Sequence, residues 1–335
     1  MSPDRALELG IALQSDKTPS DYIRLARLAE DFGFDVLSVY GDLFYQPPIY
    51  PLLLMARETR SERLGPACLN PFTLHPAEIA GQTAALDAAS GGRAFLGLAR
   101  GSWLEKLGLA RQRPLAALRD ALEVVRRLLA GDRHGYAGDV FSLAPGAALT
   151  YRPERPAVPV MVGTWSRRAA RLAAHLADEV KIGGSANPAM LKRMRGWLAD
   201  DLSSVGRARD EVGLVMGAVT VVDPDGNRAR RRAREEVAMY LDVVLELDPT
   251  VQPPEGLLAA LRRSLEDGDV AAAGRLIPDD ILDLFAFAGT PEQISRQVEA
   301  LAGAGARRID FGTPHGDPED EGIRLLGERV LPNFR

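Results

Sequence analysis

The sequence predicts an α/β protein whose strands close into a (β/α)8 barrel. Short apolar runs alternate with amphipathic stretches along almost the whole chain of 335 residues, a pattern typical of consecutive strand–helix units and a parallel sheet. The runs are apolar throughout, as expected of strands that are covered on both faces. Eight such units favour a closed barrel, which typically needs about 250 residues; an open doubly wound sheet is the alternative.

The first half of the chain contains four of these units. Ser20 can cap the first helix, Gly33 can end it, and Pro114 suits the first turn of the fourth helix. The predicted strands span residues 9–13, 35–40, 64–69 and 94–98, and the helices that follow lie between Ser20 and Gly33 and over 51–58, 75–89 and 114–130.

Two segments break the alternation. Residues 131–149 are rich in glycine and carry Tyr136, Val140, Phe141 and Leu143, so we expect a small hairpin or extended excursion after the fourth helix. Residues 251–284 are mostly helical, which predicts a helical insertion at about 250–285. This insertion either covers the barrel mouth or forms a subunit interface.

The remaining units complete a single barrel domain over residues 1–335. A capping threonine, a first-turn proline and an early acid open one helix at 290–293. The other predicted elements are strands at 158–162, 179–182, 212–222 and 308–311 and helices at 166–176, 188–202, 227–247 and 319–331.

The composition limits the class of protein. With 41 basic and 46 acidic residues, the net charge is −5, which argues against a nucleic-acid partner. We attribute the arginine-rich stretch 228–234 to a solvated helix face. A lone cysteine, Cys68, excludes an intramolecular disulfide. Residues 1–5 do not resemble the start of a signal peptide, and no run of 18 apolar residues occurs, so we expect no membrane span and a cytoplasmic location.

The active site of such a barrel lies at the carboxyl ends of the strands. Glycine recurs at nearly all of these ends, where it lets a flat or anionic ligand approach the backbone. The turns after strands five and six lead directly into helices, whose free amides favour phosphate; helix capping alone is the other explanation for either turn. The segments concerned are 41–48, 70–76, 99–102, 163–166, 183–188 and 312–316.

Other chemistries find little support. The chain has no Gly-x-Gly-x-x-Gly fingerprint after a strand, no Walker-type loop and no Gly-x-Ser-x-Gly elbow. Its four histidines lack the spacing of metal ligands, so no metal site is expected. His175 is expected to be structural and His134 to lie on the surface. His75 and His315 fall at strand ends, and His75 is either a site residue or the satisfied start of a helix.

Four motifs occur in the same order as in a known family and cover nearly the whole chain. They are residues 63–71 with 75–76, 86–87 with 90–93, 96–101, and 288–292 with 311–314. At these residues the sequence resembles the luciferase-like monooxygenase superfamily. Within it, the sequence is most similar to coenzyme F420-dependent methylenetetrahydromethanopterin reductases and their bacterial relatives.

This resemblance implies a TIM-like barrel with a flavin or deazaflavin across its strand ends. It also implies a cis peptide between Ala67 and Cys68, which shapes a bulge under the ring. Trp103 and Trp165 are candidate walls, with ordinary packing as the alternative. The residues expected to line the ring are Ala67, Cys68, Leu69, Asn70 and Gly101, and those expected to hold the ribityl phosphate are Val162, Gly163, Thr164, Gly183, Gly184 and Ser185.

Two residues are candidates for catalysis. The family's Asp-His pair after the second strand corresponds to Asp42 and Leu43, so the histidine is absent and its role cannot be assumed here. Asp42 is still expected to be a polar group near the cofactor or substrate, with a turn-forming aspartate as the alternative. His75 is the second candidate.

The resemblance favours F420 over FMN as the cofactor. F420 adds an oligoglutamate tail, and Lys181 and Arg167 stand close to the phosphate turns. We therefore expect an F420-dependent oxidoreductase that transfers a hydride between the reduced deazaflavin and a small organic substrate. The alternatives are an FMN-dependent monooxygenase served by a separate flavin reductase and a non-catalytic flavin-binding protein. A homo-oligomer is expected, and the substrate does not follow from the sequence.

Overall fold

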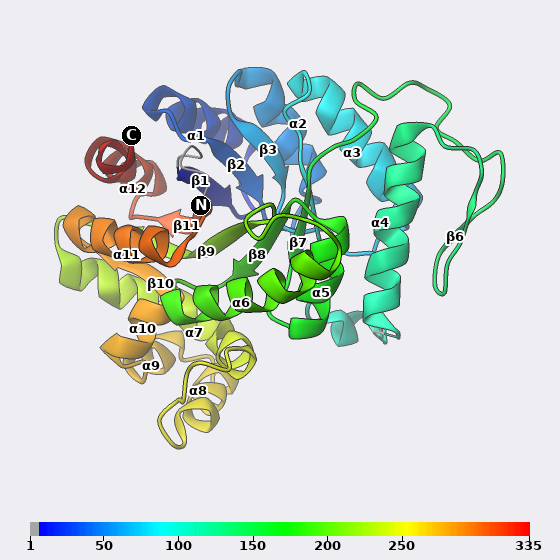
Figure 1. The fold of residues 1–335 in the computed structure, drawn as a ribbon. Coiled ribbons are helices and arrows are strands. Elements are labelled where there is room, and N and C mark those ends of the chain that lie inside the picture. Colours follow the sequence, from blue (N-terminus) through cyan, green and yellow to red (C-terminus); the bar gives the residue numbers. More distant parts are fainter. Residues whose placement is uncertain (1–6, 111) are drawn as a thin grey trace.

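Eight parallel strands surround the centre of the molecule in the computed structural model, which describes residues 7–110 and 112–335 (Figure 1). Their order around the sheet is β3-β2-β1-β11-β9-β8-β7-β4. Parallel bridges from Leu64 to Ala94 and from Leu69 to Leu98 join the two ends of this order, so the sheet closes on itself. The predicted (β/α)8 barrel is confirmed, and the open sheet is excluded.

The elements lie close to their predicted positions, with the helices around the outside of the barrel (Figure 1). The barrel strands are β1 (Glu8–Leu13), β2 (Val36–Val39), β3 (Arg63–Pro66), β4 (Leu96–Ala99), β7 (Val160–Gly163), β8 (Glu179–Gly183), β9 (Gly213–Val222) and β11 (Arg308–His315). The outer helices are α1 (Pro19–Phe32), α2 (Ile49–Glu58), α3 (Pro76–Ser90), α4 (Pro114–Ala130), α5 (Arg167–Leu176), α6 (Pro188–Ser204), α7 (Gly226–Leu247), α11 (Pro291–Ala304) and α12 (Glu319–Leu325), which continues in π-helical (Leu326–Val330) and 3-10 (Leu331–Phe334) turns.

Local hydrogen bonds set the helix ends. Thr18, rather than the predicted Ser20, caps α1: its hydroxyl accepts a hydrogen bond from the Asp21 amide. Gly33 ends this helix at a φ of +82°, a conformation that favours glycine. The predicted start of α11 is confirmed, because Thr290 and Gln293 form a reciprocal capping box.

A short hairpin of β5 (Tyr136–Ala137) and β6 (Ser142–Leu143) projects from the barrel at the right of Figure 1. Asp120 of α4 holds this hairpin in place. Its fully buried carboxylate accepts hydrogen bonds from the Tyr136 hydroxyl at 2.8 Å and from the Val140 amide at 2.7 Å. The expected excursion after the fourth helix is therefore an anchored hairpin.

The helical insertion consists of α8 (Leu257–Glu266), α9 (Val270–Arg275) and α10 (Asp279–Phe285), at the bottom of Figure 1. Its apolar side chains form a second buried cluster with α7, apart from the main core. Arg230 and Arg234 of α7 pair with Asp279. The prediction that the arginine-rich stretch is a solvated helix face is therefore wrong in part, because Arg230 and Arg234 tie the insertion to α7.

One strand was missed by the sequence pattern. β10 (Ala286–Gly289) pairs in parallel with Val219–Val222 of β9, beyond Gly217, where the pairing of β9 with β8 ends. Its four residues follow α10 directly, without a turn residue between the two elements. The apolar run therefore continues from helix to strand with no boundary that a sequence pattern could reveal.

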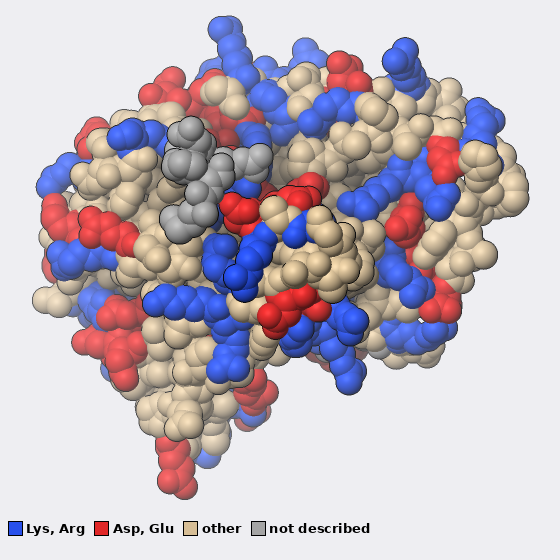
Figure 2. Space-filling view, viewed as in Figure 1, with Lys and Arg blue, Asp and Glu red and all other residues tan. Residues whose placement is uncertain are grey.

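The molecular surface carries both charges. Acidic and basic side chains are interspersed over the face shown in Figure 2. Within the two described ranges, no helix is long and apolar enough to cross a membrane. Residues 1–5, for which we expected no signal peptide, lie outside the described part of the chain.

Candidate functional site

The carboxyl ends of the strands meet around the Ala67–Cys68 peptide, which is cis, as the family resemblance implied. Cys68 is half-buried and lies between Gly41, after β2, and Gly163, at the end of β7. A Cβ atom at Gly41 would lie 2.3 Å from the Cys68 carbonyl oxygen, and one at Gly163 would lie 3.0 Å from the sulfur. Glycine alone fits this closely, so the rim beside Cys68 is bare backbone.

Burial also determines the chemical state of Cys68. It raises the pKa of the thiol to about 11, although the nearby ammonium of Lys181 acts in the opposite direction. A thiol with such a pKa is protonated at neutral pH and is a poor nucleophile. Cys68 therefore offers a neutral surface to a ligand.

Asn70 and Gly101 continue the rim toward β4. Asn70 Oδ1 accepts hydrogen bonds from the amides of Phe72 and Thr73, at 3.1 and 3.0 Å, and so fixes the turn after β3. Gly101 has a φ of +76°, and a Cβ there would lie 3.0 Å from Asn70 Cγ. The two residues therefore lie side by side, with backbone rather than side chain at position 101.

The turn after β7 has the features of an anion site. Thr164 Oγ1 accepts a hydrogen bond from the Ser166 amide at 3.0 Å, and the Ser166 hydroxyl caps α5 by accepting one from the Ala169 amide at 3.1 Å. An α-helix leaves its first amides without intrahelical partners. The amides of Arg167 and Arg168 are therefore available to a phosphate group at this end of α5.

The turn after β8 lacks these features. The amides of Gly184 and Ser185 both donate to the Gly217 carbonyl, at 2.6 and 3.0 Å, and the Ser185 side chain is fully buried. The expectation of a second amide cradle here is wrong, because these donors fasten the turn to β9. Gly183 does face open space: a Cβ there would meet no atom within 4 Å in the described chain.

Two other predicted cofactor residues are core residues. Val162 is fully buried and Leu69 is 6% exposed, and both belong to the main apolar core. Their side chains are packed in this core, so we expect Leu69 to approach the ring, and Val162 the ribityl phosphate, through backbone atoms. Ala67, by contrast, is half-buried and packs with Cys68 against the apolar residues inside the barrel.

The basic residues expected near an acidic tail are both engaged elsewhere. Lys181 points into the barrel, where its ammonium lies 2.5 Å from Asp310 Oδ2 and its side chain is 4% exposed. The prediction that Lys181 holds an oligoglutamate tail is therefore wrong, because a tail outside the barrel cannot reach it. The Arg167 guanidinium is paired with Asp201 of α6.

The two candidate tryptophan walls are half-buried. The indole nitrogen of Trp165 donates to the Gly183 carbonyl at 3.1 Å, so its ring spans the turns after β7 and β8. Trp165 also packs against both apolar clusters. Trp103 has a φ of +51°, and the ammonium of Lys106 lies 6.0 Å from the centre of its ring.

Asp42 lies in the segment after β2 and remains open to solvent. Its carboxylate accepts a hydrogen bond at 2.9 Å from the side-chain amide of Gln14, which follows β1. The surrounding protein atoms raise the pKa of Asp42, and the Gln14 hydrogen bond opposes them only in part. An accessible carboxyl group whose pKa is raised above its ordinary value is suited to proton transfer.

His75 has a structural task. Its Nδ1 accepts a hydrogen bond from the Ala77 amide at 3.2 Å, and it is the N-cap of α3. The ring packs edge-on against Phe141 of the hairpin, with 5.6 Å between the ring centres. These contacts account for His75 as the satisfied start of a helix.

Three further ionisable residues, which were not predicted, are linked to Asp42 through their charges: Asp42 and Tyr240 act on the pKa of Tyr40, and Glu236 acts on that of Tyr240. Tyr40 directly follows β2, and Glu236 and Tyr240 lie one turn apart on α7. Burial, and then the charges of Asp310, Tyr240 and Asp42, hold the pKa of Tyr40 well above its usual value. Burial likewise raises the pKa of Glu236. The helical pattern of α7 gave no sign that this side of the helix faces the mouth.

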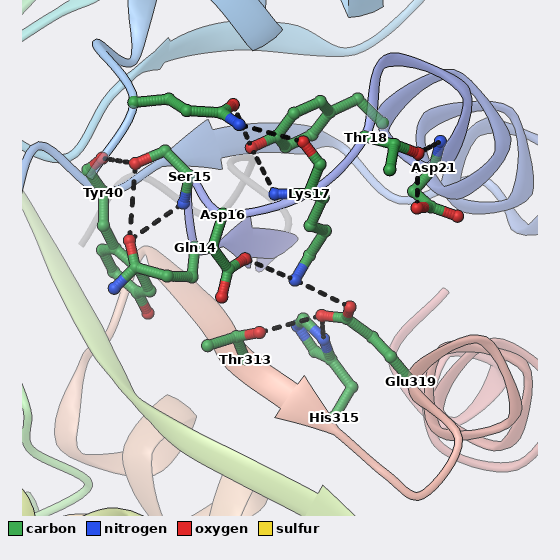
Figure 3. Close-up of polar contacts among 12 residues, drawn as sticks. Gln14, Ser15, Asp16, Lys17, Thr18, Asp21, Tyr40, Thr313, His315 and Glu319 are labelled. Atoms are coloured by element: carbon green, nitrogen blue, oxygen red, sulfur yellow. Dashed lines mark hydrogen bonds and ion pairs between the residues drawn. The ribbon is translucent and has the colours of Figure 1, made fainter.

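A polar cluster joins the ends of β1 and β11 (Figure 3). Glu319 accepts a hydrogen bond from the Thr313 hydroxyl at 2.8 Å, and its carboxylate lies 2.9 Å from the Lys17 ammonium and 3.1 Å from His315 Nδ1. Burial acts to raise the pKa of Glu319, but His315 and Lys17 outweigh it and lower the pKa to about 2. An ionised carboxylate thus holds the first and last strand loops together.

Comparisons with known proteins agree with this geometry. The model of the luciferase-like monooxygenase family matches residues 7–308. A 5,10-methylenetetrahydromethanopterin reductase from Archaeoglobus fulgidus is 30% identical over 340 residues, which cover 98% of this chain and 100% of the relative. An F420-dependent glucose-6-phosphate dehydrogenase from Microbacterium testaceum is 29% identical over 338 residues, which cover 95% of this chain and 94% of the relative.

A solved structure confirms the architecture. The coenzyme F420-dependent tetrahydromethanopterin reductase from Methanopyrus kandleri matches with a TM-score of 0.89 over 98% of this chain and 100% of that chain. The two sequences are 24% identical, so this likeness concerns the fold.

Proposed function

The chain belongs to the luciferase-like monooxygenase family, and we propose that it is an F420-dependent oxidoreductase that transfers a hydride between this deazaflavin and a small organic substrate. The observation that carries the proposal is similarity over nearly the whole chain to a methylenetetrahydromethanopterin reductase and to an F420-dependent dehydrogenase. These relatives differ in substrate. We therefore extend to this chain the redox chemistry that both relatives perform, and we assign the substrate separately.

The glycine rim suits a flat tricyclic ring. Gly41, Gly101 and Gly163 leave no room for a Cβ, and Gly183 opens onto empty space in the described structure. A planar ring can approach backbone closely where side chains are missing. We assign the ring to the rim beside Cys68 and Asn70, and the ribityl phosphate to the amides at the start of α5.

When bound, F420 exchanges a hydride with a carbon atom of the substrate. The barrel orients the ring, excludes water and moves one proton. We assign this proton transfer to Asp42, because its surroundings raise its pKa and its side chain is open to solvent at the end of β2. In the direction of substrate reduction, Asp42 gives its proton to the substrate heteroatom; in the reverse direction it takes one. Leu43 supplies no such group, and His75 is occupied as a helix cap.

For the substrate itself, we rank a pterin of the methylenetetrahydromethanopterin type first. The relative that acts on it aligns from end to end with this chain at 30% identity. An FMN-dependent monooxygenase with a separate reductase is the second candidate function, because the family model that matches residues 7–308 is named for luciferase-like monooxygenases.

The proposal is tested by titrating the protein, freed of small molecules, with F420 and separately with FMN, and following the fluorescence of each. We expect saturable binding of one F420 per chain and much weaker binding of FMN. Tight FMN binding without a response to F420 would overturn the proposal. Binding of F420 without turnover of pterin, imine or carbonyl substrates would instead identify a non-catalytic binding protein.

A further inference from the structure

Alternating charges form a ladder inside the barrel. Glu179 lies 2.8 Å from both Arg63 and Arg308. Asp310 lies 3.0 Å from Arg308 and 2.5 Å from Lys181. Arg63, Glu179 and Arg308 begin β3, β8 and β11, whereas Lys181 and Asp310 are the third residues of β8 and β11. The ladder therefore rises from the amino ends of the strands toward the mouth, and Lys181 and Asp310 are its upper members.

Stability does not explain this ladder. Taking an ion out of water costs several kcal/mol, and well-packed apolar residues in place of a buried ion pair are often equally stable. Among the described residues, Arg308 Nε and Asp310 Oδ1 lack a well-aligned hydrogen bond, although they are 3.0 Å apart. With Glu8, whose carboxylate lies 3.7 Å from Arg63 at the lower end, three cations and three anions make up the ladder, and the anion paired with Lys181 at the upper end is Asp310.

Lys181 lies immediately behind the glycine rim. It is the β-sheet partner of Gly163, the glycine that approaches the Cys68 sulfur. Its ammonium is 6.0 Å from the centre of the Tyr40 ring, and its charge is close enough to Cys68 to act on the thiol pKa. Gly217 makes room for it, since a Cβ there would lie 3.2 Å from Nζ. The ammonium is thus fixed beside the Cys68 bulge.

We propose that the Lys181 ammonium, held by Asp310, stabilises the negative charge that a bound deazaflavin ring acquires when it takes up a hydride. This inference rests on the proposed function and assigns to Lys181 a role other than tail binding. The ladder beneath Lys181 keeps its charge in place, because the carboxylate of Asp310 is shared with Arg308 and does not fully neutralise it.

The balance of the step is simple. A hydride brings two electrons and one proton from the substrate carbon, so the ring becomes one charge unit more negative until a solvent proton joins it. A fixed positive charge beside the ring stabilises that state without having to reorganise. The groups that face the ammonium are Asp310 and Arg308 of β11, Tyr40 after β2 and Cys68 after β3.

The wild-type protein gives the first test. The dissociation constants of oxidised and reduced F420 are measured separately by anaerobic titration, and their ratio gives the change in the midpoint potential on binding. We expect the reduced form to bind at least about tenfold more tightly, which corresponds to about 1.4 kcal/mol. Equal affinities, or tighter binding of the oxidised form, overturn the inference. Failure of both forms to bind would contradict the proposed function instead.

A pair of variants supplies the matched control. Lys181→Met combined with Asp310→Asn removes both charges, so no buried carboxylate is left unpaired. Lys181→Arg alone keeps a positive charge opposite Asp310. We expect the preference for reduced F420 to fall about tenfold or more in the double variant and to persist in the single one. An unchanged preference in a double variant with wild-type thermal unfolding overturns the inference.

Discussion

Asp42 combines a raised pKa with an accessible side chain. A turn-forming aspartate surrounded by water would keep an ordinary pKa, but nearby protein atoms raise the pKa of Asp42, although its side chain is open to solvent. Its hydrogen bond with Gln14 links the ends of β2 and β1. The carboxyl group therefore lies where a substrate above the rim could exchange a proton with it.

Asp42→Asn is expected to lower kcat about 100-fold or more while the dissociation constant of F420 stays the same, because general acid–base groups contribute about 10²–10⁴-fold. In the direction in which Asp42 donates a proton, the wild-type rate should fall as the pH rises through its raised pKa. That limb should be absent from the variant. Steady-state kinetics with the first substrate found by screening check this. The control is Asp16→Asn, since Asp16 is an exposed aspartate after β1 that pairs with Lys17. A wild-type kcat in Asp42→Asn would rule out the assigned role.

Glu62 is a second carboxyl group with a shifted pKa, and it takes no part in the proposed reaction. It is fully buried, and neither of its carboxylate oxygens has a hydrogen-bond partner in the part of the chain that the structure describes. Burial, reinforced by the neighbouring Glu30, raises the pKa of Glu62 to about 8. The group is therefore protonated in the folded protein at neutral pH.

This shift predicts a pH dependence of stability. Because the folded pKa of Glu62, about 8, exceeds the unfolded value of 4.5, its contribution is complete below pH 4.5 and is lost as the pH rises through 8. Glu62→Gln should remove that loss and unfold at a higher temperature than wild type above pH 8. Thermal unfolding between pH 5 and 9 measures it, with the exposed Glu154→Gln as control. Parallel pH profiles for wild type and Glu62→Gln would contradict the account.

At the scale of elements, the turns after β7 and β8 have similar sequences, but their backbone amides have different hydrogen-bond partners. Both combine glycine with a capping residue before a helix. The turn before α5 leaves first-turn amides free, whereas the turn before α6 donates its amides to Gly217 of β9. The contact with Gly217 cannot be deduced from the sequence of the turn itself, because the acceptor lies on another strand.

Gly183→Ala tests the rim directly. A methyl group there meets no described atom within 4 Å, so the unfolding temperature should hardly change. If a ring or its ribityl chain crosses this position, the methyl group should weaken F420 binding about tenfold or more. Gly196→Ala, on the exposed side of α6, is the matched control and should leave binding intact. Unchanged F420 affinity in Gly183→Ala would mean that the cofactor does not cross this turn.

The barrel could be predicted because each strand and helix carries its own local signal, such as the apolar run of β7 or the capping box of α11. β10 lacks such a signal, since it follows α10 without a break. The glycine rim could be predicted from its place at the strand ends. The sequence could not predict which residues next to the rim are buried, because Val162 and Ser185 are adjacent to the turns but are covered by neighbouring elements.

The charged ladder did leave a signal that the sequence analysis overlooked. Glu179 and Lys181 alternate with Val180, and Arg308 and Asp310 alternate with Ile309. Residues two apart in a strand point to the same side. This spacing places the two charges of each pair on one side of their strand, and the structure shows that this side faces the barrel interior.

At the scale of the whole molecule, the barrel and its insertion contribute different parts of the structure. The strands and their turns supply the glycine rim and the charge ladder. The insertion packs against α7, the helix that brings Glu236 and Tyr240 to the mouth. The insertion therefore braces α7, and whether it covers the barrel mouth or forms a subunit interface stays a prediction.

A crystal structure of the protein with bound F420 tests the central claim most directly. We predict that the deazaflavin ring lies across the rim between Cys68 and Gly101, that its phosphate contacts the amides of Arg167 and Arg168, and that the Lys181 ammonium remains beneath the ring. A ring bound elsewhere on the molecule, or a phosphate held by the turn after β8, would contradict the account.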